Sequence, residues 1–307
     1  MTAVDDVSFE LYPGESLGVV GESGCGKTVT SKSIMRLLPP EVTIFGKESQ
    51  IEYEGKNLLK QSESHMRYVR GNEIAMIFQE PMTALNPVFT VGWQLDEALK
   101  YHTKLSRSGR RERAIEMMRL VEMPNPEKRL DEYPHQLSGG MRQRVMIGIA
   151  LCCEPKILIA DEPTTALDVT IQAQILRLME NLQTKTGTAV MLVTHDLGVV
   201  AQTCDRVMVM YAGRVVESAP VHDIFERPQH PYTKALLASI PKPGQRPEGG
   251  RLPAIEGVVP SLFDLPEGCR FYDRCGGCQQ KCIDEEPSLT INDNRSVRCH
   301  FPVGENQ

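Results

Sequence analysis

The sequence predicts an α/β fold followed by an irregular C-terminal extension. Over residues 1–217, short apolar segments of strand length alternate with longer segments of helical character. A glycine-rich loop at residues 21–28 stands between an apolar strand and a helix. After about residue 218 proline and glycine become frequent, and such sequence cannot continue a regular α/β layer. We therefore expect a domain over 1–217 and an extension over 218–307.

The composition limits the classes of protein that need to be considered. The chain has 307 residues, of which 24% are charged and 41% are hydrophobic, as in globular proteins. Its net charge of −6 argues against nucleic acid as a partner, because phosphate-binding surfaces are usually basic. No apolar run approaches the roughly 20 residues of a membrane-spanning helix, and the first residues lack the pattern of a secretion signal. We expect a cytoplasmic location.

The first loop, in the segment "LGVVGESGCGKT" at residues 17–28, has the pattern G-x-x-x-x-G-K-T. A strand before it and a helix over 29–38 after it are the context that a phosphate-binding loop requires. Its glycines let backbone N–H groups approach an anion at the helix N-terminus. Cys25 is either a thiol activated by this helix end or simply a small residue. The predicted binding residues are Gly21, Glu22, Ser23, Gly24, Cys25, Gly26, Lys27 and Thr28.

Two adjacent acids follow the apolar segment "ILIA" at residues 157–160, which we expect to form a buried strand. Asp161 could hold Mg²⁺ directly or through water, and Glu162 could orient and deprotonate an attacking water molecule. The alternative is a solvated acidic turn after a strand. A phosphate-binding loop earlier in the chain favours the catalytic interpretation.

The segment "LSGGMRQR" at residues 137–144 predicts a second anion-binding helix terminus. Ser138 is a good N-cap residue, and Gly139 and Gly140 expose backbone N–H groups. One γ-phosphate cannot contact two well-separated helix ends of a single domain. We therefore expect the second terminus to serve a nucleotide bound by a neighbouring subunit.

Together these segments resemble the ATP-binding cassette (ABC) ATPases over most of residues 1–217. The resemblance implies a RecA-like P-loop core, an antiparallel β subdomain, and a helical subdomain over about 84–140. The helical subdomain contains helical patterns near 91–102 and 108–122. A lone histidine after a strand is more often a packing residue, but His195 stands at the family's switch position. The remaining correspondences are the Walker A loop at 21–28, the Walker B acids Asp161 and Glu162, the signature at 137–141, the Q-loop Gln79 and the D-loop Asp168.

The resemblance also implies cofactors and partners. ATP would bind with Mg²⁺, and Thr28, Gln79 and Asp161 would lie at the metal. A second ABC ATPase, identical or not, would close head-to-tail on this chain, so that each ATP lies between one Walker A loop and the opposing signature. The chain would be a peripheral protein on the cytoplasmic face of the membrane, where two permease subunits dock on the helical subdomain.

Several features indicate which kind of cassette this is. Only about 110 residues separate Lys27 from Ser138, so there is no room for the long coiled coil of DNA-repair cassettes. The sequence shows no second Walker A loop or signature, whereas translation factors have two cassettes in tandem. The segment "HPYTKALLASIP" at residues 230–241 resembles importer ATPases for oligopeptides, dipeptides and sometimes nickel. We expect peptide import, with nickel import as the alternative, fed by an extracytoplasmic substrate-binding protein.

A cluster of cysteines near the C-terminus has the spacing C-x5-C-x6-C-x16-C, with Cys278 inside the second gap. So many thiolates suit iron–sulfur or zinc, and free thiols are the third possibility. The resemblance favours a [4Fe–4S] cluster, because some peptide-importer ATPases carry one here. Because the cysteines lie far from the catalytic motifs in the sequence, we expect the cluster to be a structural clasp and not a cofactor of hydrolysis. The predicted ligands are Cys269, Cys275, Cys282 and Cys299.

The chain departs from the family at its start. It begins with "MTAVDDVSFELYPGE", where related cassettes first have another strand and a loop with an aromatic residue that stacks on adenine. We expect that this N-terminal strand is missing, through a late start or a true absence. Without the aromatic residue, adenine would lose about 1 kcal/mol of stacking energy, and ATP binding would weaken several-fold.

Overall fold

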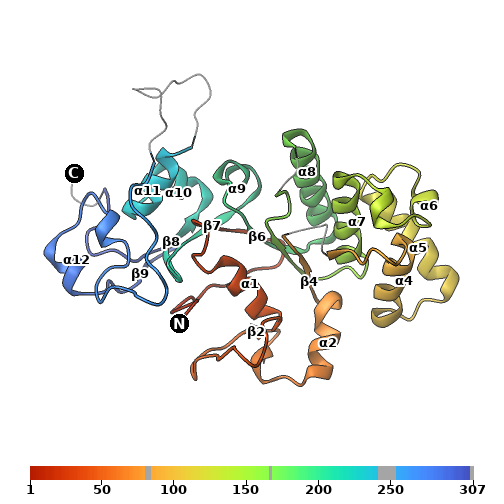
Figure 1. Ribbon diagram of the computed structural model, residues 1–307, viewed down its shortest axis with the longest axis horizontal. Helices are drawn as coiled ribbons and strands as arrows, with labels where there is room; N and C mark the ends of the chain where they lie inside the picture. The colour runs from red at the N-terminus through yellow and green to blue at the C-terminus, as the bar shows by residue number, and fades with distance from the viewer. Residues whose placement is uncertain (80–83, 166–167, 241–253, 305–307) are drawn as a thin grey trace. The chain divides into compact units, whose positions relative to one another are not determined.

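The computed structural model describes residues 1–79, 84–165, 168–240 and 254–304. These residues form two compact units, in which segments distant in the sequence lie together (Figure 1). The first unit contains residues 1–11, 16–30 and 192–307, and the second contains 12–15 and 31–191. The chain therefore passes between the units several times.

Parallel and antiparallel strands lie side by side in the first unit, in the order β1-β7-β8-β10-β9. The central pair β1 and β7 is parallel, with Gly18 opposite Val207, and β7 pairs with β8 in antiparallel fashion. Both β1 and β7 are buried almost throughout, as expected for strands covered on both faces. These strands are Ser16–Val20 (β1), Arg206–Tyr211 (β7), Arg214–Pro220 (β8), Thr290–Asn292 (β9) and Arg295–Val297 (β10).

The helices of the first unit are short. Asp196 caps α9, because its carboxylate accepts hydrogen bonds from the backbone N–H groups of Gly198 and Val199. Helix α1 begins at Lys27 and ends at Ile34 in the second unit, so it is shorter than the predicted helix over 29–38. The other helices are Leu197–Thr203 (α9), Val221–Glu226 (α10), Pro231–Ala238 (α11), the 3₁₀ turn Tyr272–Arg274 (η4) and Gln280–Asp284 (α12).

Strands of the second unit include the parallel pair β4 and β5, with Ala75 opposite Leu158. Both strands are apolar and almost fully buried, which confirms the strand predicted over 157–160. A short antiparallel hairpin, β2–β3, precedes them. Strand β6 begins in this unit and ends in the first. The bounds are Glu52–Tyr53 (β2), Lys56–Asn57 (β3), Ile74–Ile77 (β4), Ile157–Asp161 (β5) and Ala189–Val193 (β6).

A group of helices makes up the other part of the second unit, where α4 and α5 pack on each other and on α7 (Figure 1). Helix α4 has the bounds predicted for it, and Thr90 caps its N-terminus. Helix α5 begins one residue before the predicted range, and Ser106 caps it. The helices of this unit are Leu58–Lys60 (η1), Glu63–Asn72 (α2), Val91–His102 (α4), Arg107–Leu120 (α5), Pro126–Arg129 (α6), Pro134–Gln136 (η2), Gly139–Leu151 (α7) and Val169–Thr186 (α8).

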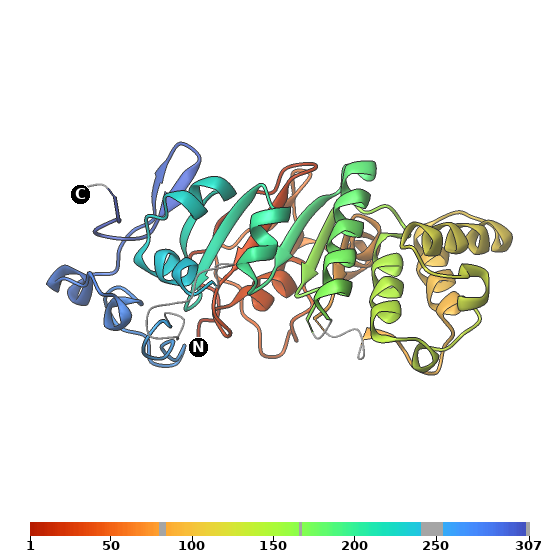
Figure 2. The same cartoon turned by 90° about the horizontal axis from the view of Figure 1, so that it is seen from above.

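The C-terminal extension is more regular than its composition predicts. Strands β9 and β10 form a hairpin, drawn in blue in Figure 2, and β10 pairs with β8 with Val297 opposite Glu217. The hairpin turns at Asp293, which adopts a left-handed backbone with φ 49°. Aspartate tolerates this conformation better than most residues. The extension thus adds two strands to those of the first unit.

None of the helices in the described segments is both long and apolar enough to cross a membrane.

Candidate functional site

The glycine-rich loop joins β1 to α1 in the geometry that its sequence predicts. Gly21 has φ 152°, and a Cβ atom there would stand 2.2 Å from the carbonyl oxygen of Met210. Gly26 has φ 103°, and its Cβ would stand 2.8 Å from the carbonyl oxygen of Ala3. Because neither position has room for a side chain, both glycines are required for the loop to lie against its neighbours.

Lys27 lies inside this loop. Its side chain is almost buried, and its Nζ atom donates hydrogen bonds to the carbonyl oxygens of Gly21 at 2.7 Å and Glu22 at 3.1 Å. Burial raises the pKa of the neighbouring Cys25 thiol more than the charge of Lys27 lowers it. Cys25 is also 0% exposed. The burial and the raised pKa favour a small packing residue over an activated thiol, and the role of Cys25 stays a prediction.

In the second unit, the ends of β4 and β5 bring two predicted site residues together. Gln79, just after β4, donates from Nε2 to Oε2 of Glu162, just after β5, over 2.9 Å. Thr165 donates from its hydroxyl to the same oxygen at 2.9 Å. Glu162 has φ 48°, a strained backbone conformation for a residue other than glycine that often marks functional sites. Asp161 is 1% exposed at the end of β5.

Ser138 is the N-cap of α7, as predicted. Its backbone is extended, and its hydroxyl accepts a hydrogen bond from the N–H of Met141 at 3.4 Å. A Cβ on Gly139 would meet no atom within 4 Å, whereas one on Gly140 would lie 3.0 Å from a methyl group of Ile171. The helix terminus thus presents an exposed serine and open space beside it.

Helix α7 also contacts the acidic segment through a residue that the motifs did not single out. The side chain of Gln143 is 1% exposed, and its amide donates to the carbonyl oxygen of Pro163, next to Glu162. A glutamine on the buried face of an apolar helix is a signal that sequence inspection could have used, because such a group needs a partner. Thr165 lies within "DEPTTALD" and was likewise missed.

Two other predicted residues stand at helix starts. Asp168 caps α8, with Oδ1 accepting from the N–H of Ile171 at 2.9 Å. His195 follows β6 in the first unit, is exposed, and directly precedes the cap residue of α9. Residues 166 and 167 of the predicted D-loop lie outside the described residues.

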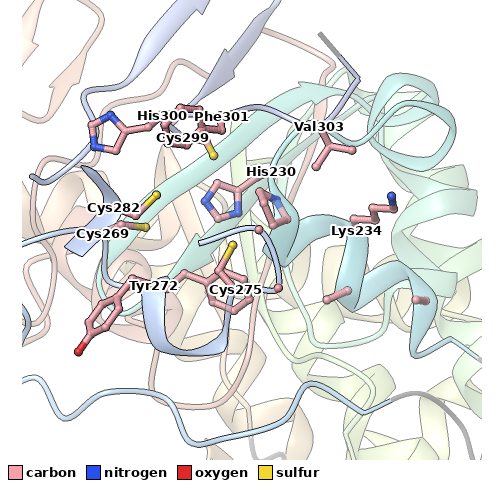
Figure 3. Close-up of a pocket in the computed structure, with 16 residues that line it drawn as sticks. His230, Lys234, Cys269, Tyr272, Cys275, Cys282, Cys299, His300, Phe301 and Val303 are labelled. Carbon is pink, nitrogen blue, oxygen red and sulfur yellow. The ribbon is translucent and has the colours of Figure 1, made fainter. Parts of the chain in front are cut away.

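All four predicted cysteine ligands line one cavity of about 370 Å³ in the first unit. Figure 3 shows the side chains of Cys269, Cys275, Cys282 and Cys299 turned toward it from separate parts of the extension. Cys278 is not part of this lining. Burial raises the pKa of Cys269 to about 12 and that of Cys299 to about 11, so these thiols are protonated at neutral pH unless a metal binds.

Within the described residues, no three or more His, Cys, Asp or Glu side chains converge closely enough to hold a metal ion. Neither the zinc nor the iron–sulfur interpretation is supported by such a group. The cysteine set stays a prediction.

Comparison with known proteins identifies the class. Residues 4–165 match the family model "ABC transporter", and this match covers more than half of the chain. The chain therefore belongs to the ABC transporter family. Residues 216–282 match a second family model, "Oligopeptide/dipeptide transporter, C-terminal region". The ATPase motifs and the extension thus point to one subgroup of the family.

Curated relatives resemble the chain over nearly its full length. It is 58% identical to the "Probable peptide ABC transporter ATP-binding protein y4tR" of Sinorhizobium fredii, over 97% of this chain and 88% of that protein. It is 54% identical to the dipeptide transport ATP-binding protein DppD of Bacillus subtilis, over the same shares. The identity to DppD of Escherichia coli is 49%, over 99% of this chain and 92% of the relative.

Solved structures agree with this assignment. A dimeric ATP-binding cassette in a post-hydrolysis state, bound to ADP and Pi, superposes with a TM-score of 0.63 at 28% identity, covering 71% of this chain and 90% of that one. The chain is an ATP-hydrolysing transport ATPase with the cassette fold. Family membership implies ATP and Mg²⁺, a dimer of cassettes and membrane permease partners.

Proposed function

We propose that the chain is the ATP-hydrolysing subunit of an importer for dipeptides or oligopeptides. The observation that carries the proposal is the hydrogen bond between Gln79 and Glu162 in a chain that also matches a peptide-transporter C-terminal region. The relatives described above are named for peptide transport, which favours peptides over nickel. The same C-terminal region argues against a role in DNA repair or translation.

The glycine-rich loop at residues 21–28 is proposed to bind the phosphates of ATP. Lys27 would exchange its bonds to the Gly21 and Glu22 carbonyls for bonds to phosphate oxygens. Thr28 and Asp161 are the proposed Mg²⁺ ligands, with Gln79 nearby, because hydroxyl and carboxylate oxygens suit this hard cation. When bound, Mg²⁺ neutralises charge on the phosphates.

Glu162 is the proposed general base. The bonds from Gln79 and Thr165 to Oε2 hold the carboxylate of Glu162 in a defined orientation at the end of β5, and a general base must be held in this way. The water attacks the γ-phosphorus, its proton passes to Glu162, and ADP leaves. His195 is the proposed contact to the γ-phosphate.

Ser138, Gly139 and Gly140 are proposed to bind ATP held by the second ATPase subunit. The open space beside Gly139 and the exposed position of Ser138 support this role. Asp168, at the start of α8, would lie at the same subunit interface. We further propose a peripheral position at the cytoplasmic face of the membrane and an external substrate-binding protein that delivers the peptide.

The substrate proposal can be tested with the assembled transporter. We expect that ATP hydrolysis by the complex of this chain, its permeases and the binding protein rises with di- and oligopeptides and not with Ni²⁺. The same complex carrying Glu162→Gln is the control for contaminating ATPases. If Ni²⁺ alone stimulated ATP hydrolysis, nickel import would be the function in place of peptide import.

For the cavity we propose a [4Fe–4S] cluster bound by Cys269, Cys275, Cys282 and Cys299. A [4Fe–4S] cluster would be held by four cysteine thiolates, as a structural zinc could be, and the family resemblance favours the cluster. Four thiols around one cavity fit this donor set. The cluster would join segments of the extension as a structural clasp.

The cluster proposal predicts the metal content of the full chain purified without oxygen. We expect about four iron and four sulfide per chain, a loss of both in Cys275→Ser, and no loss in Cys278→Ser, the matched control outside the cavity lining. Zinc in place of iron, or an equal loss in both variants, would contradict the assignment.

A further inference from the structure

Arg274, in the C-terminal extension, forms an ion pair with Glu22 of the phosphate-binding loop. Nη1 of Arg274 lies 2.7 Å from Oε2 of Glu22, and Nη2 lies 3.0 Å from Oε1. This is the bidentate arrangement in which a guanidinium and a carboxylate bind most strongly. The two residues are 252 positions apart in the sequence, and both belong to the first unit.

Arg274 itself is fixed from several sides. It donates to the carbonyl oxygens of Glu256 at 2.9 Å and Ile255 at 3.3 Å, and to the hydroxyl of Tyr211 at 3.2 Å. Its guanidinium carbon stands 5.7 Å from the centre of the Tyr211 ring, within reach of a cation–π interaction. Its side chain is 2% exposed. A buried and fully bonded arginine is a rigid anchor, since it has little freedom left to lose.

The backbone of Glu22 is held as well. The hydroxyl of Tyr232, in the "HPYTK" segment, accepts a hydrogen bond from the Glu22 N–H at 2.9 Å. Tyr232 is 0% exposed and packs against the ring of Tyr211, with 4.7 Å between the ring centres. Glu22 is thus held at both its side chain and its backbone by the part of the chain after residue 206.

We propose that Arg274 and Tyr232 are positioning residues for nucleotide binding: they hold Glu22, and through it the phosphate-binding loop, in the conformation that receives ATP. The proposal rests on the phosphate-binding role given to this loop above. A glycine-rich loop has many accessible conformations, and binding a ligand must restrict them. A loop that is already restricted binds with less entropic cost, so the extension contributes to ATP affinity without touching ATP.

The test is the affinity of the full chain for ATP, measured by calorimetry. We expect Tyr232→Phe, which removes one oxygen, to raise the Kd roughly fivefold, the lower end of typical coupling between sites. Arg274→Met and Glu22→Gln should each do the same or more. The double variant of Arg274 and Glu22 should have a Kd for ATP no higher than that of the weaker-binding single variant, because both substitutions break the same ion pair. Equal affinity in Tyr232→Phe and Glu22→Gln would overturn the proposal.

Two controls separate this inference from its premise. Arg298→Met removes another buried arginine of the extension, which bonds to Asp6 and to the carbonyl of Val215 and also precedes a cysteine of the cavity. It should lower the melting temperature and leave the Kd for ATP unchanged. An equal rise in Kd would mean that the variants act through general destabilisation. Lys27→Ala should abolish ATP binding. If ATP still binds to this variant, the phosphate-binding role of the loop fails, and the positioning role fails with it. If Lys27→Ala abolishes binding and Tyr232→Phe and Glu22→Gln leave the Kd unchanged, only the positioning role fails.

The steady-state kinetics of the assembled transporter provide a readout that a purely structural role would not give. Tyr232→Phe should raise the KM for ATP roughly fivefold and leave kcat almost unchanged, because only the affinity-setting contact is lost. A fall in kcat with constant KM would contradict a positioning role in binding.

Discussion

Two loops of the molecule each carry a glutamate at a strand end, and they hold it in different ways. After β5, Glu162 accepts hydrogen bonds from the neutral side chains of Gln79 and Thr165. After β1, Glu22 forms a bidentate ion pair with the buried guanidinium of Arg274. Both arrangements orient a carboxylate, and the guanidinium of Arg274 also compensates the charge of Glu22.

We connect this difference to two roles, proton transfer for Glu162 and support of the phosphate-binding loop for Glu22. A general base must accept a proton, and a guanidinium partner opposes protonation more strongly than neutral donors do. Glu162, held by Gln79 and Thr165, is proposed to receive the proton of the attacking water. Glu22, whose carboxylate binds Arg274 and whose backbone N–H donates to Tyr232, is suited to keep its loop in place. The comparison predicts different consequences when each glutamate, or its partners, is changed.

The largest effect should come from Glu162→Gln. The amide keeps the size of the side chain but cannot accept the proton, so kcat of the assembled transporter should fall about a hundredfold or more. ATP affinity of the variant should stay near that of the unchanged chain. Phosphate release and calorimetry measure the two quantities, and hydrolysis at more than half the normal rate would remove Glu162 as the base.

A smaller loss should follow from Ser138→Arg, which blocks the exposed terminus of α7. We expect kcat to fall by about tenfold to a hundredfold, since misplacing a contact at a composite site has effects of this size. ATP binding to the isolated chain should be unaffected, because the proposed ligand belongs to the partner. Weaker ATP binding by the isolated chain would place the serine at its own nucleotide.

Thr165→Val should have a moderate effect. The substitution keeps the shape and removes the hydroxyl that donates to Glu162. A hydrogen bond of about 1 kcal/mol corresponds to roughly a fivefold fall in kcat, with the KM for ATP unchanged. Thr184→Val is the matched control, because its hydroxyl bonds to a carbonyl within α8. Equal losses in both variants would contradict the orienting role.

The smallest effect concerns Cys25, which lies within the loop that Glu22 supports. Because its thiol is buried and protonated, a maleimide should label it slowly, and ATP should change the labelling little. Mass spectrometry of the alkylated peptide gives the rate. Fast labelling that ATP prevents would restore the activated thiol.

Much of the site could be predicted from short segments. The glycine-rich loop, the N-cap Ser138 and the strand that ends in Asp161 depend on local chemistry, and the structure has all three. Gln79 was predicted from the family resemblance, which gives its position after an apolar strand the role of the Q-loop glutamine. Parallel neighbours end at the same edge, so it meets Glu162 there.

The supporting contacts could not be predicted in this way. Arg274 and Tyr232 reach Glu22 across more than 200 positions, and no periodicity or spacing records such a pair. The hairpin β9–β10 was missed because its strands are short and exposed, so they lack the alternation that indicates a buried face. Helix α1 was predicted too long because the apolar run continues past its end.

The most direct test compares Glu22→Gln with Glu162→Gln in the steady-state ATPase kinetics of the assembled transporter. We expect Glu22→Gln to raise the KM for ATP and leave kcat almost unchanged, and Glu162→Gln to lower kcat and leave KM almost unchanged. If both substitutions lower kcat alike, or if Glu22→Gln has no effect on KM, the two glutamates do not divide support and chemistry between them.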